Sequence, residues 1–155
     1  LAMAAYARFS DGETGVAHAA TAEREVVPST GTPPKALDRK ADPTADHYAA
    51  IAGRWHGVGH QPDVGMDWDV DITIEAGAVG EQVGTVAYPT LGCRGELTRR
   101  PDEGETLVIE ERITVDPEGS CVKQGTIKIS RAGNALAFKW YYPNGTEAAH
   151  GTLSR

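Results

Sequence analysis

The chain has 155 residues, of which 40% are hydrophobic, and a formal net charge of −7 at neutral pH. This length is enough for one domain and short for two. The acidic balance argues against a nucleic-acid partner and against an anionic membrane surface, because both need clustered Lys and Arg. No apolar run approaches the roughly 20 residues that span a bilayer, so we expect membrane attachment only through a segment absent from this chain.

Residues 1–48 are predicted to be a flexible tail. They are rich in Ala, Thr, Glu, Pro and Gly and contain few large apolar residues, so they cannot bury enough surface to offset the entropy of ordering. Within the tail, the sequence of 29–34 is typical of a semi-extended linker. Residues 46–52 are expected to form one short helical turn that plugs one end of the domain that follows, which we place at 49–155.

Beyond residue 53 the hydrophobic period changes to two, the period of a β-strand with one buried face. In 66–75 one face is apolar and the other is polar and largely acidic. The same alternation recurs in 107–115 and in 136–142. Such strands are typical of an antiparallel sheet that packs one face against a core.

Turn signals rich in Gly, Pro, Asn and Asp separate these runs, and Asn144–Gly145 is a strong two-residue hairpin signal. We therefore predict eight strands, near 53–60, 66–75, 82–88, 91–99, 106–115, 121–130, 134–142 and 145–154. Short links between consecutive strands predict a meander. The predicted fold is all-β, an eight-stranded antiparallel up-and-down barrel, which removes the sheet edges. A two-sheet β-sandwich is the alternative.

The two cysteines, Cys93 and Cys121, predict one disulfide in an oxidising compartment. The alternative is a pair of reduced cysteines in the core. The predicted strands place the cysteines at the starts of strands four and six, which are about 9–10 Å apart. A disulfide needs Cα atoms within about 7 Å, so we expect flared strand ends or a bend at Leu91–Gly92.

Two resemblances concern the fold. Gly53-Arg-Trp55 at the start of strand one, with Arg155 after the last strand, resembles the calycin arrangement of lipocalins, avidins and fatty-acid-binding proteins. That resemblance implies that Trp55 packs across the barrel floor against the guanidinium of Arg155. The barrel sequence is also similar to the extracytoplasmic C-terminal module of some bacterial transmembrane serine/threonine kinases, which implies a location and a sensor class without naming a ligand. The segments that carry this similarity are 55–57, Trp68, 83–93, 95–97, 111–114, Cys121 and 151–155.

A third resemblance concerns a cofactor. Residues 53–59 fit the GxWxGxG pattern of nitrobindins, barrels that bind haem through a histidine on a late strand, and His150 lies on the last predicted strand. Two features depart from that family. Tyr88–Pro89 comes some thirty residues later than the family's Tyr-Pro, and His150 falls on the face opposite Leu153, which we assign to the interior. We therefore expect no cofactor, with haem on His150 as the alternative.

Glu111 is the most informative candidate for a binding residue. By strand alternation it shares a face with Ile109 and Ile113, where an ionised carboxylate is costly unless it is paired. Lys123 on the next strand is the predicted partner, across the diagonal of the sheet. The alternatives are a purely structural salt bridge or a β-bulge that turns Glu111 towards solvent.

Five aromatic residues could line a ligand pocket or fill a solid core: Trp55, Trp68, Tyr88, Trp140 and Tyr142. The predicted ligand-binding set is Trp55, Trp68, Tyr88, Glu111, Lys123 and Trp140. Asp67, Asp69 and Asp71 alternate along a strand and are interpreted as a solvated outer face.

The sequence shows no nucleophile elbow and no positioned catalytic triad. His56 and His60 would stand about 13 Å apart on one strand, too far for one metal ion. The hypothesis is a non-enzymatic, extracytoplasmic ligand-binding or sensor barrel for a small molecule or a cell-envelope component. The alternatives are a protein-interaction or inhibitor domain with a filled core, and the haem-binding barrel.

Overall fold

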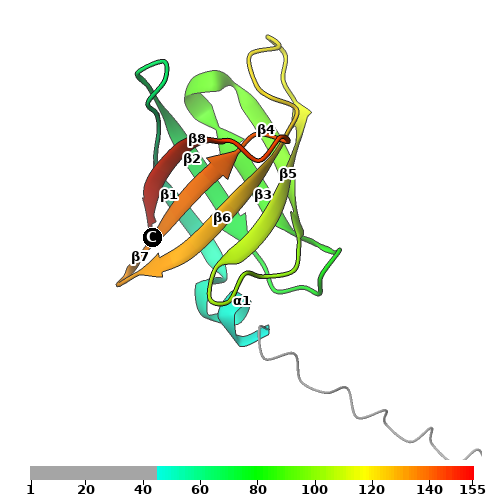
Figure 1. Ribbon diagram of the computed structural model, residues 1–155. Coiled ribbons are helices and arrows are strands. Elements are labelled where there is room, and N and C mark those ends of the chain that lie inside the picture. Colours follow the sequence, from blue (N-terminus) through cyan, green and yellow to red (C-terminus); the bar gives the residue numbers. More distant parts are fainter. Residues whose placement is uncertain (1–44) are drawn as a thin grey trace, which may run out of the picture. The chain divides into compact units, whose positions relative to one another are not determined.

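The computed structural model describes residues 45–155, and the predicted tail up to residue 44 lies outside them. The described chain is a closed barrel in which every strand is antiparallel to the next and β1 also pairs with β8 (Figure 1). The elements, in chain order, are α1 (Ala45–Ile51), β1 (Gly53–Gln61), β2 (Met66–Ile74), β3 (Gln82–Tyr88), η1 (Pro89–Leu91), β4 (Cys93–Arg99), β5 (Leu107–Val115), β6 (Gln124–Ala132), β7 (Ala135–Tyr141) and β8 (Glu147–Ser154).

The predicted up-and-down barrel is confirmed, and the two-sheet sandwich is wrong. Each of the eight predicted strands coincides with an observed one. The largest difference at the start of a strand is at β6, which begins at Gln124 rather than near residue 121. Among the described residues, no helix is long and apolar enough to cross a membrane.

The strands alternate as the period of two predicts. In β2, Val70, Ile72 and Ile74 are almost completely buried, while Asp67 and Asp71 on the other face pair with His60 and His56 of β1. Burial of each large aliphatic side chain contributes about 1.5–3 kcal/mol. The interior positions of all the strands therefore form a single hydrophobic core.

Helix α1 covers one end of the barrel, which we call the closed end (Figure 1). Its Tyr48 and Ile51 are buried in the core cluster, so the prediction that this segment plugs the barrel is confirmed. The Trp55 indole N–H donates to the carbonyl oxygen of Ile51 at 2.8 Å. The Arg155 guanidinium lies 4.7 Å from the centre of the Trp55 ring and donates to Ala52 O. This is the floor that the calycin resemblance implies.

A second cation lies at the closed end and is fully buried. The Arg99 guanidinium donates to Gly77 O at 2.8 Å and forms an ion pair with Asp102 at 2.9 Å. It also stacks 4.3 Å from the centre of the Tyr48 ring. Since a buried charge is tolerated only with good partners, this pair ties the β2–β3 and β4–β5 connections to α1.

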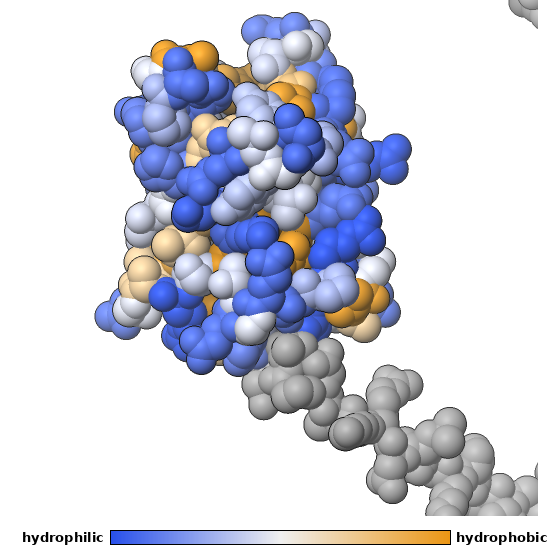
Figure 2. Space-filling view, in the orientation of Figure 1, coloured by the Kyte–Doolittle hydropathy of each residue, from blue (hydrophilic) through white to orange (hydrophobic). Residues whose placement is uncertain are grey.

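The opposite end is formed by the β1–β2, β3–β4, β5–β6 and β7–β8 connections, and we call it the open end (Figure 1). The face seen in Figure 2 is mostly hydrophilic, with hydrophobic residues at several places that include this end. Val64 and Val122 of its connections are 58% and 45% exposed, and Met66 at the start of β2 is 46% exposed. No α-helix of the described residues covers this end, whereas α1 covers the other.

Candidate ligand-binding cavity

The interior is hollowed at the open end. A cavity of about 220 Å³ lies between the ends of the strands and the connections above them. Its walls are mainly aromatic and aliphatic side chains with a few polar groups, the usual composition of a small-molecule site. The lining residues are Gln61, Met66, Trp68, Tyr88, Leu91, Glu111, Ile113, Ser120, Cys121, Val122, Trp140, Tyr142, Ala148 and Ala149.

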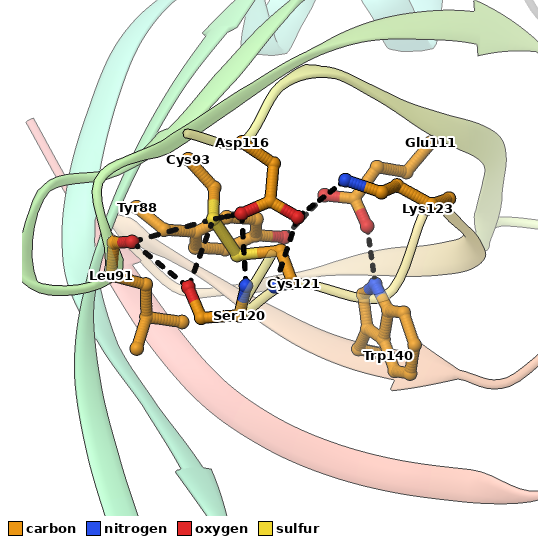
Figure 3. The surroundings of a disulfide bond; sticks show 9 residues. All are labelled: Tyr88, Leu91, Cys93, Glu111, Asp116, Ser120, Cys121, Lys123 and Trp140. Carbon is orange, nitrogen blue, oxygen red and sulfur yellow. Dashed lines mark hydrogen bonds and ion pairs between the residues drawn. A yellow bond between two sulfur atoms is a disulfide. The ribbon is translucent and has the colours of Figure 1, made fainter. Parts of the chain in front are cut away.

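Glu111 is the carboxylate of this cavity. Strand alternation points it inward, and it is 1% exposed, so the alternative in which a bulge turns it towards solvent is wrong. The Tyr88 hydroxyl donates to its Oε1, and the Trp140 indole N–H donates to its Oε2 at 2.6 Å (Figure 3). One residue from β3 and one from β7 thus hold a side chain from β5, across the barrel interior.

The protonation of this cluster is set by burial. Burial raises the pKa of Glu111 above its ordinary value, and the hydrogen bonds from Tyr88 and Trp140 oppose that shift. Burial and the neighbouring Glu111 raise the pKa of the Tyr88 hydroxyl well above its ordinary value. Tyr88 therefore keeps its proton and remains a donor at every physiological pH.

Two glycines make room for the cavity tryptophans. Gly125 lies opposite Glu111 in the β5–β6 ladder, and a Cβ at this position would overlap the Trp140 ring. Gly59 lies opposite Trp68 in the β1–β2 ladder, and a Cβ there would lie 2.9 Å from the Trp68 ring. Each indole therefore lies directly over backbone. Trp140 also meets Tyr142 edge to face, with ring centroids 5.1 Å apart.

The predicted disulfide is confirmed. Cys93 and Cys121 are bonded, with Cα atoms 6.5 Å apart. The expected distance problem does not arise, because Cys121 precedes β6 and lies in the β5–β6 connection, which bends over the barrel rim. The expected bend at the other cysteine is also present, since η1 and a left-handed Gly92 come immediately before Cys93. The disulfide thereby fastens the β5–β6 connection to the start of β4.

Asp116 organises the rest of this connection. It accepts hydrogen bonds from the backbone N–H groups of Ser120 and Cys121 at 3.0 and 3.3 Å, and from the Lys123 ammonium (Figure 3). The hydrogen bond from Lys123 is the main cause that lowers the pKa of Asp116. The Ser120 hydroxyl donates to Leu91 O at 3.2 Å. Although Asp116 lies beside both cysteine sulfurs, the disulfide leaves no thiolate to bind a metal.

The predicted ion pair of Glu111 with Lys123 is wrong. Lys123 is bonded to Asp116 and its side chain is 66% exposed, so it lies on the outside of the rim. Its backbone does lie where the sequence predicted, since Lys123 O accepts from the N–H of Ile113. The error concerns the side chain. Asp116, which also accepts hydrogen bonds from the backbone of its own turn, pairs with Lys123 in place of the buried Glu111.

The structure therefore brings together four of the six predicted ligand-binding residues. Trp68, Tyr88, Glu111 and Trp140 all line the cavity, whereas Trp55 lies at the closed end. Tyr142 was expected among the inner aromatic residues, but Gln61, Leu91 and Ser120 were not expected as lining residues. Gln61 is the last residue of β1, whereas Leu91 and Ser120 lie in the β3–β4 and β5–β6 connections. The turn signals of the sequence predict these connections but not how they fold over the rim.

His150 lies on the outer surface. Its side chain is 51% exposed, beside Glu147, and its ring meets that of His60 at a centroid distance of 5.8 Å. The outward assignment of this residue is correct, so the histidine that a nitrobindin-like haem site would use points away from the cavity.

Comparisons with known proteins give no relative. No protein-family model matches the chain, and neither the curated proteins nor the solved structures contain a significant match. The function is therefore inferred from the geometry of the barrel and its cavity.

Proposed function

We propose that this barrel is a non-enzymatic ligand-binding module that works outside the cytoplasm and holds a small molecule in the cavity at its open end. The observation that carries the proposal is the cavity of about 220 Å³, lined by Trp68, Tyr88 and Trp140 around one buried carboxylate. Aromatic walls with a few convergent polar groups are typical of a small-molecule site. A domain with a completely filled core would have no such space.

The asymmetry of the barrel supports the same proposal. The closed end is sealed by α1 and by the Trp55–Arg155 pair, which resembles the floor of calycin barrels. The open end leaves its tryptophans only partly buried. A barrel that is packed at one end and hollow at the other is suited to receiving a ligand from one side.

The disulfide supports a location outside the cytoplasm. The disulfide joins Cys93 and Cys121, which are 28 positions apart in the sequence. Disulfides persist in oxidising compartments. The barrel sequence is similar to the extracytoplasmic module of some bacterial transmembrane serine/threonine kinases. For this reason we propose that ligand binding serves sensing. The ligand is then a small molecule or a fragment of a cell-envelope component.

The three tryptophans of the chain provide the test. In a ¹H–¹⁵N spectrum, the indole signals of Trp68 and Trp140 should move when a ligand fills the cavity, while that of Trp55 at the closed end should not. We would titrate ¹⁵N-labelled protein with a library of small apolar and aromatic compounds, and record native mass spectra of protein purified from its own source. If no compound moves the cavity signals and the purified protein carries nothing, the proposal fails.

A second candidate function is an interaction with another protein through the rim of the open end. The exposed side chains of Val64, Met66 and Val122 favour it. The same titration separates the two, because a partner that covers the rim broadens backbone signals of the connections, whereas a small ligand moves mainly the signals of the interior.

A further inference from the structure

Among the residues that the structure describes, the cavity is lined by one carboxylate and by no cation. Glu111 is the only acidic residue of 45–155 in its walls, and no Lys, Arg or His of that range is among them. No ion pair joins Glu111 to any basic side chain of residues 45–155. The nearest charged pair on the β5–β6 connection is Lys123 with Asp116, and these two neutralise each other at the rim. Any charge on Glu111 is therefore left uncompensated by the basic side chains of residues 45–155.

The two side chains that contact Glu111 donate to it and so favour its ionised form, against the effect of burial. An indole N–H can only donate, and the Trp140 N–H points at Oε2 while the Tyr88 hydroxyl donates to Oε1. A carboxylate has about four lone-pair positions on its two oxygens, so the two donors leave capacity for a further donor from the cavity. When Glu111 is ionised, the site offers a negatively charged hydrogen-bond acceptor, and residues 45–155 place no cation beside it.

The walls around the carboxylate are aromatic. Trp68, Tyr88, Trp140 and Tyr142 all line the cavity, and Trp140 meets Tyr142 edge to face. The faces of such rings carry partial negative charge and attract ammonium groups, most strongly when the site is shielded from water. An anion would be repelled by both the carboxylate and the ring faces, while a neutral ligand would leave the carboxylate uncompensated.

We propose that the ligand of this cavity is a small organic cation, whose ammonium group sits beside Glu111 and whose apolar or aromatic body packs against the surrounding rings. This inference rests on the proposed ligand-binding function and specifies its ligand class. The cavity volume of about 220 Å³ is below the roughly 300–1,000 Å³ of pockets that hold drug-sized ligands. It therefore suits an arylalkylamine or a short methylated amine rather than a lipid.

The test compares the affinities of three compounds that share a phenylethyl body and carry a positive, a neutral or a negative polar group. We would titrate the protein with 2-phenylethylamine, with 2-phenylethanol and with 3-phenylpropanoate, using calorimetry and the indole signals of Trp68 and Trp140. The amine is expected to bind about tenfold or more tightly than the alcohol, and the carboxylate is expected not to bind. The Trp140 indole proton, which is bonded to Glu111, should shift most with the amine.

Glu111→Gln should remove the preference for the amine and leave the alcohol affinity within a fewfold. The matched control is Glu110→Gln, since Glu110 is the next residue on the same strand and pairs outside the barrel with Arg100; this variant should keep the preference. The comparison of the three compounds on the unsubstituted protein does not depend on either variant folding.

The outcomes separate the two proposals. Equal binding of the amine and the alcohol at the cavity tryptophans overturns the cation inference and leaves the ligand-binding function standing. Tighter binding of the carboxylate also overturns it. If neither these compounds nor a graded series of amines and alcohols moves the Trp68 and Trp140 signals, both proposals fail.

Discussion

The two ends of this barrel use the same kinds of side chain for different purposes. Each has a tryptophan whose indole N–H donates a hydrogen bond, Trp55 to a backbone carbonyl and Trp140 to a carboxylate. At the closed end the buried cation Arg99 has its own buried anion, Asp102. At the open end the buried anion Glu111 has no cation among the described residues. The difference shows where packing serves stability and where space is kept for a ligand.

The largest effect is expected from breaking the closed end. Arg99→Ala leaves Asp102 buried without its cation and removes the stacking on Tyr48. Breaking one partner of a buried pair costs about 3–5 kcal/mol, so the free energy of unfolding in urea should fall by that amount.

Arg100→Ala provides the control. This neighbouring arginine pairs with Glu110 at the surface and is 47% exposed, so its loss should cost at most about 1 kcal/mol. Equal losses for the two variants would show that the closed end does not hold the stability assigned to it here.

Removing the disulfide should weaken the fold and disturb only the open end. The bond closes a separation of 28 residues, for which chain entropy gives about 3.6 kcal/mol. We expect the double substitution Cys93→Ser with Cys121→Ser to lower the urea midpoint and to shift the Trp140 indole signal. The Trp55 signal should stay in place. If Trp55 shifts as strongly as Trp140, the two ends are not independent.

Gly125→Ala tests how closely the Trp140 ring lies over the backbone. The backbone at Gly125 is open to any residue, but an added Cβ would overlap the Trp140 ring. Overpacking of this kind costs about 1–3 kcal/mol, and the hydrogen bond to Glu111 should lengthen, which the Trp140 indole shift would report. The next residue, Thr126, points outward, and Thr126→Ala should change stability by less than about 0.5 kcal/mol. A neutral Gly125→Ala would mean that the ring can move freely.

The closed end was predictable in part. Alternation of apolar and polar residues predicted the strands, and the calycin resemblance implied the floor of Trp55 and Arg155. The buried pair of Arg99 and Asp102 was not predicted. The interior position of Glu111 followed from the same period. Its partners did not, since Tyr88 and Trp140 reach it from strands distant in sequence, and only closure of the barrel brings β3, β5 and β7 to face one another.

The rim of the cavity was the least predictable part. The sequence predicted that Lys123 lies near Glu111. The partner of a long flexible side chain depends on which carboxylate the folded loop places within its reach, and here that carboxylate is Asp116. The predicted start of β6 near Cys121 was wrong for a similar reason, since β6 begins at Gln124. Hydrogen bonds within the β5–β6 connection hold 116–123 outside the ladder, and a period-two pattern carries no information about them.

The smallest expected effect is a pH dependence of the free energy of unfolding, and it arises from Glu111 at the open end. The pKa of Glu111 is raised by burial above its ordinary value of 4.5. Above that value, and up to the pKa in the fold, the folded chain binds more protons than the unfolded chain, so the free energy of unfolding falls as pH rises. The groups that face Glu111 are Tyr88, which stays protonated, and Trp140, which does not titrate.

Glu111→Gln should therefore gain stability relative to the unsubstituted protein as pH rises from 4.5, and the gain should level off above the pKa that Glu111 has in the fold. Every other carboxylate is common to both proteins and cancels in the difference of their urea midpoints. Glu110→Gln, at the surface, should show no such trend. A difference that stays constant with pH would mean that Tyr88 and Trp140 fully offset the cost of burying the charge. The carboxylate would then need no cation, and the strongest argument for a cationic ligand would be lost.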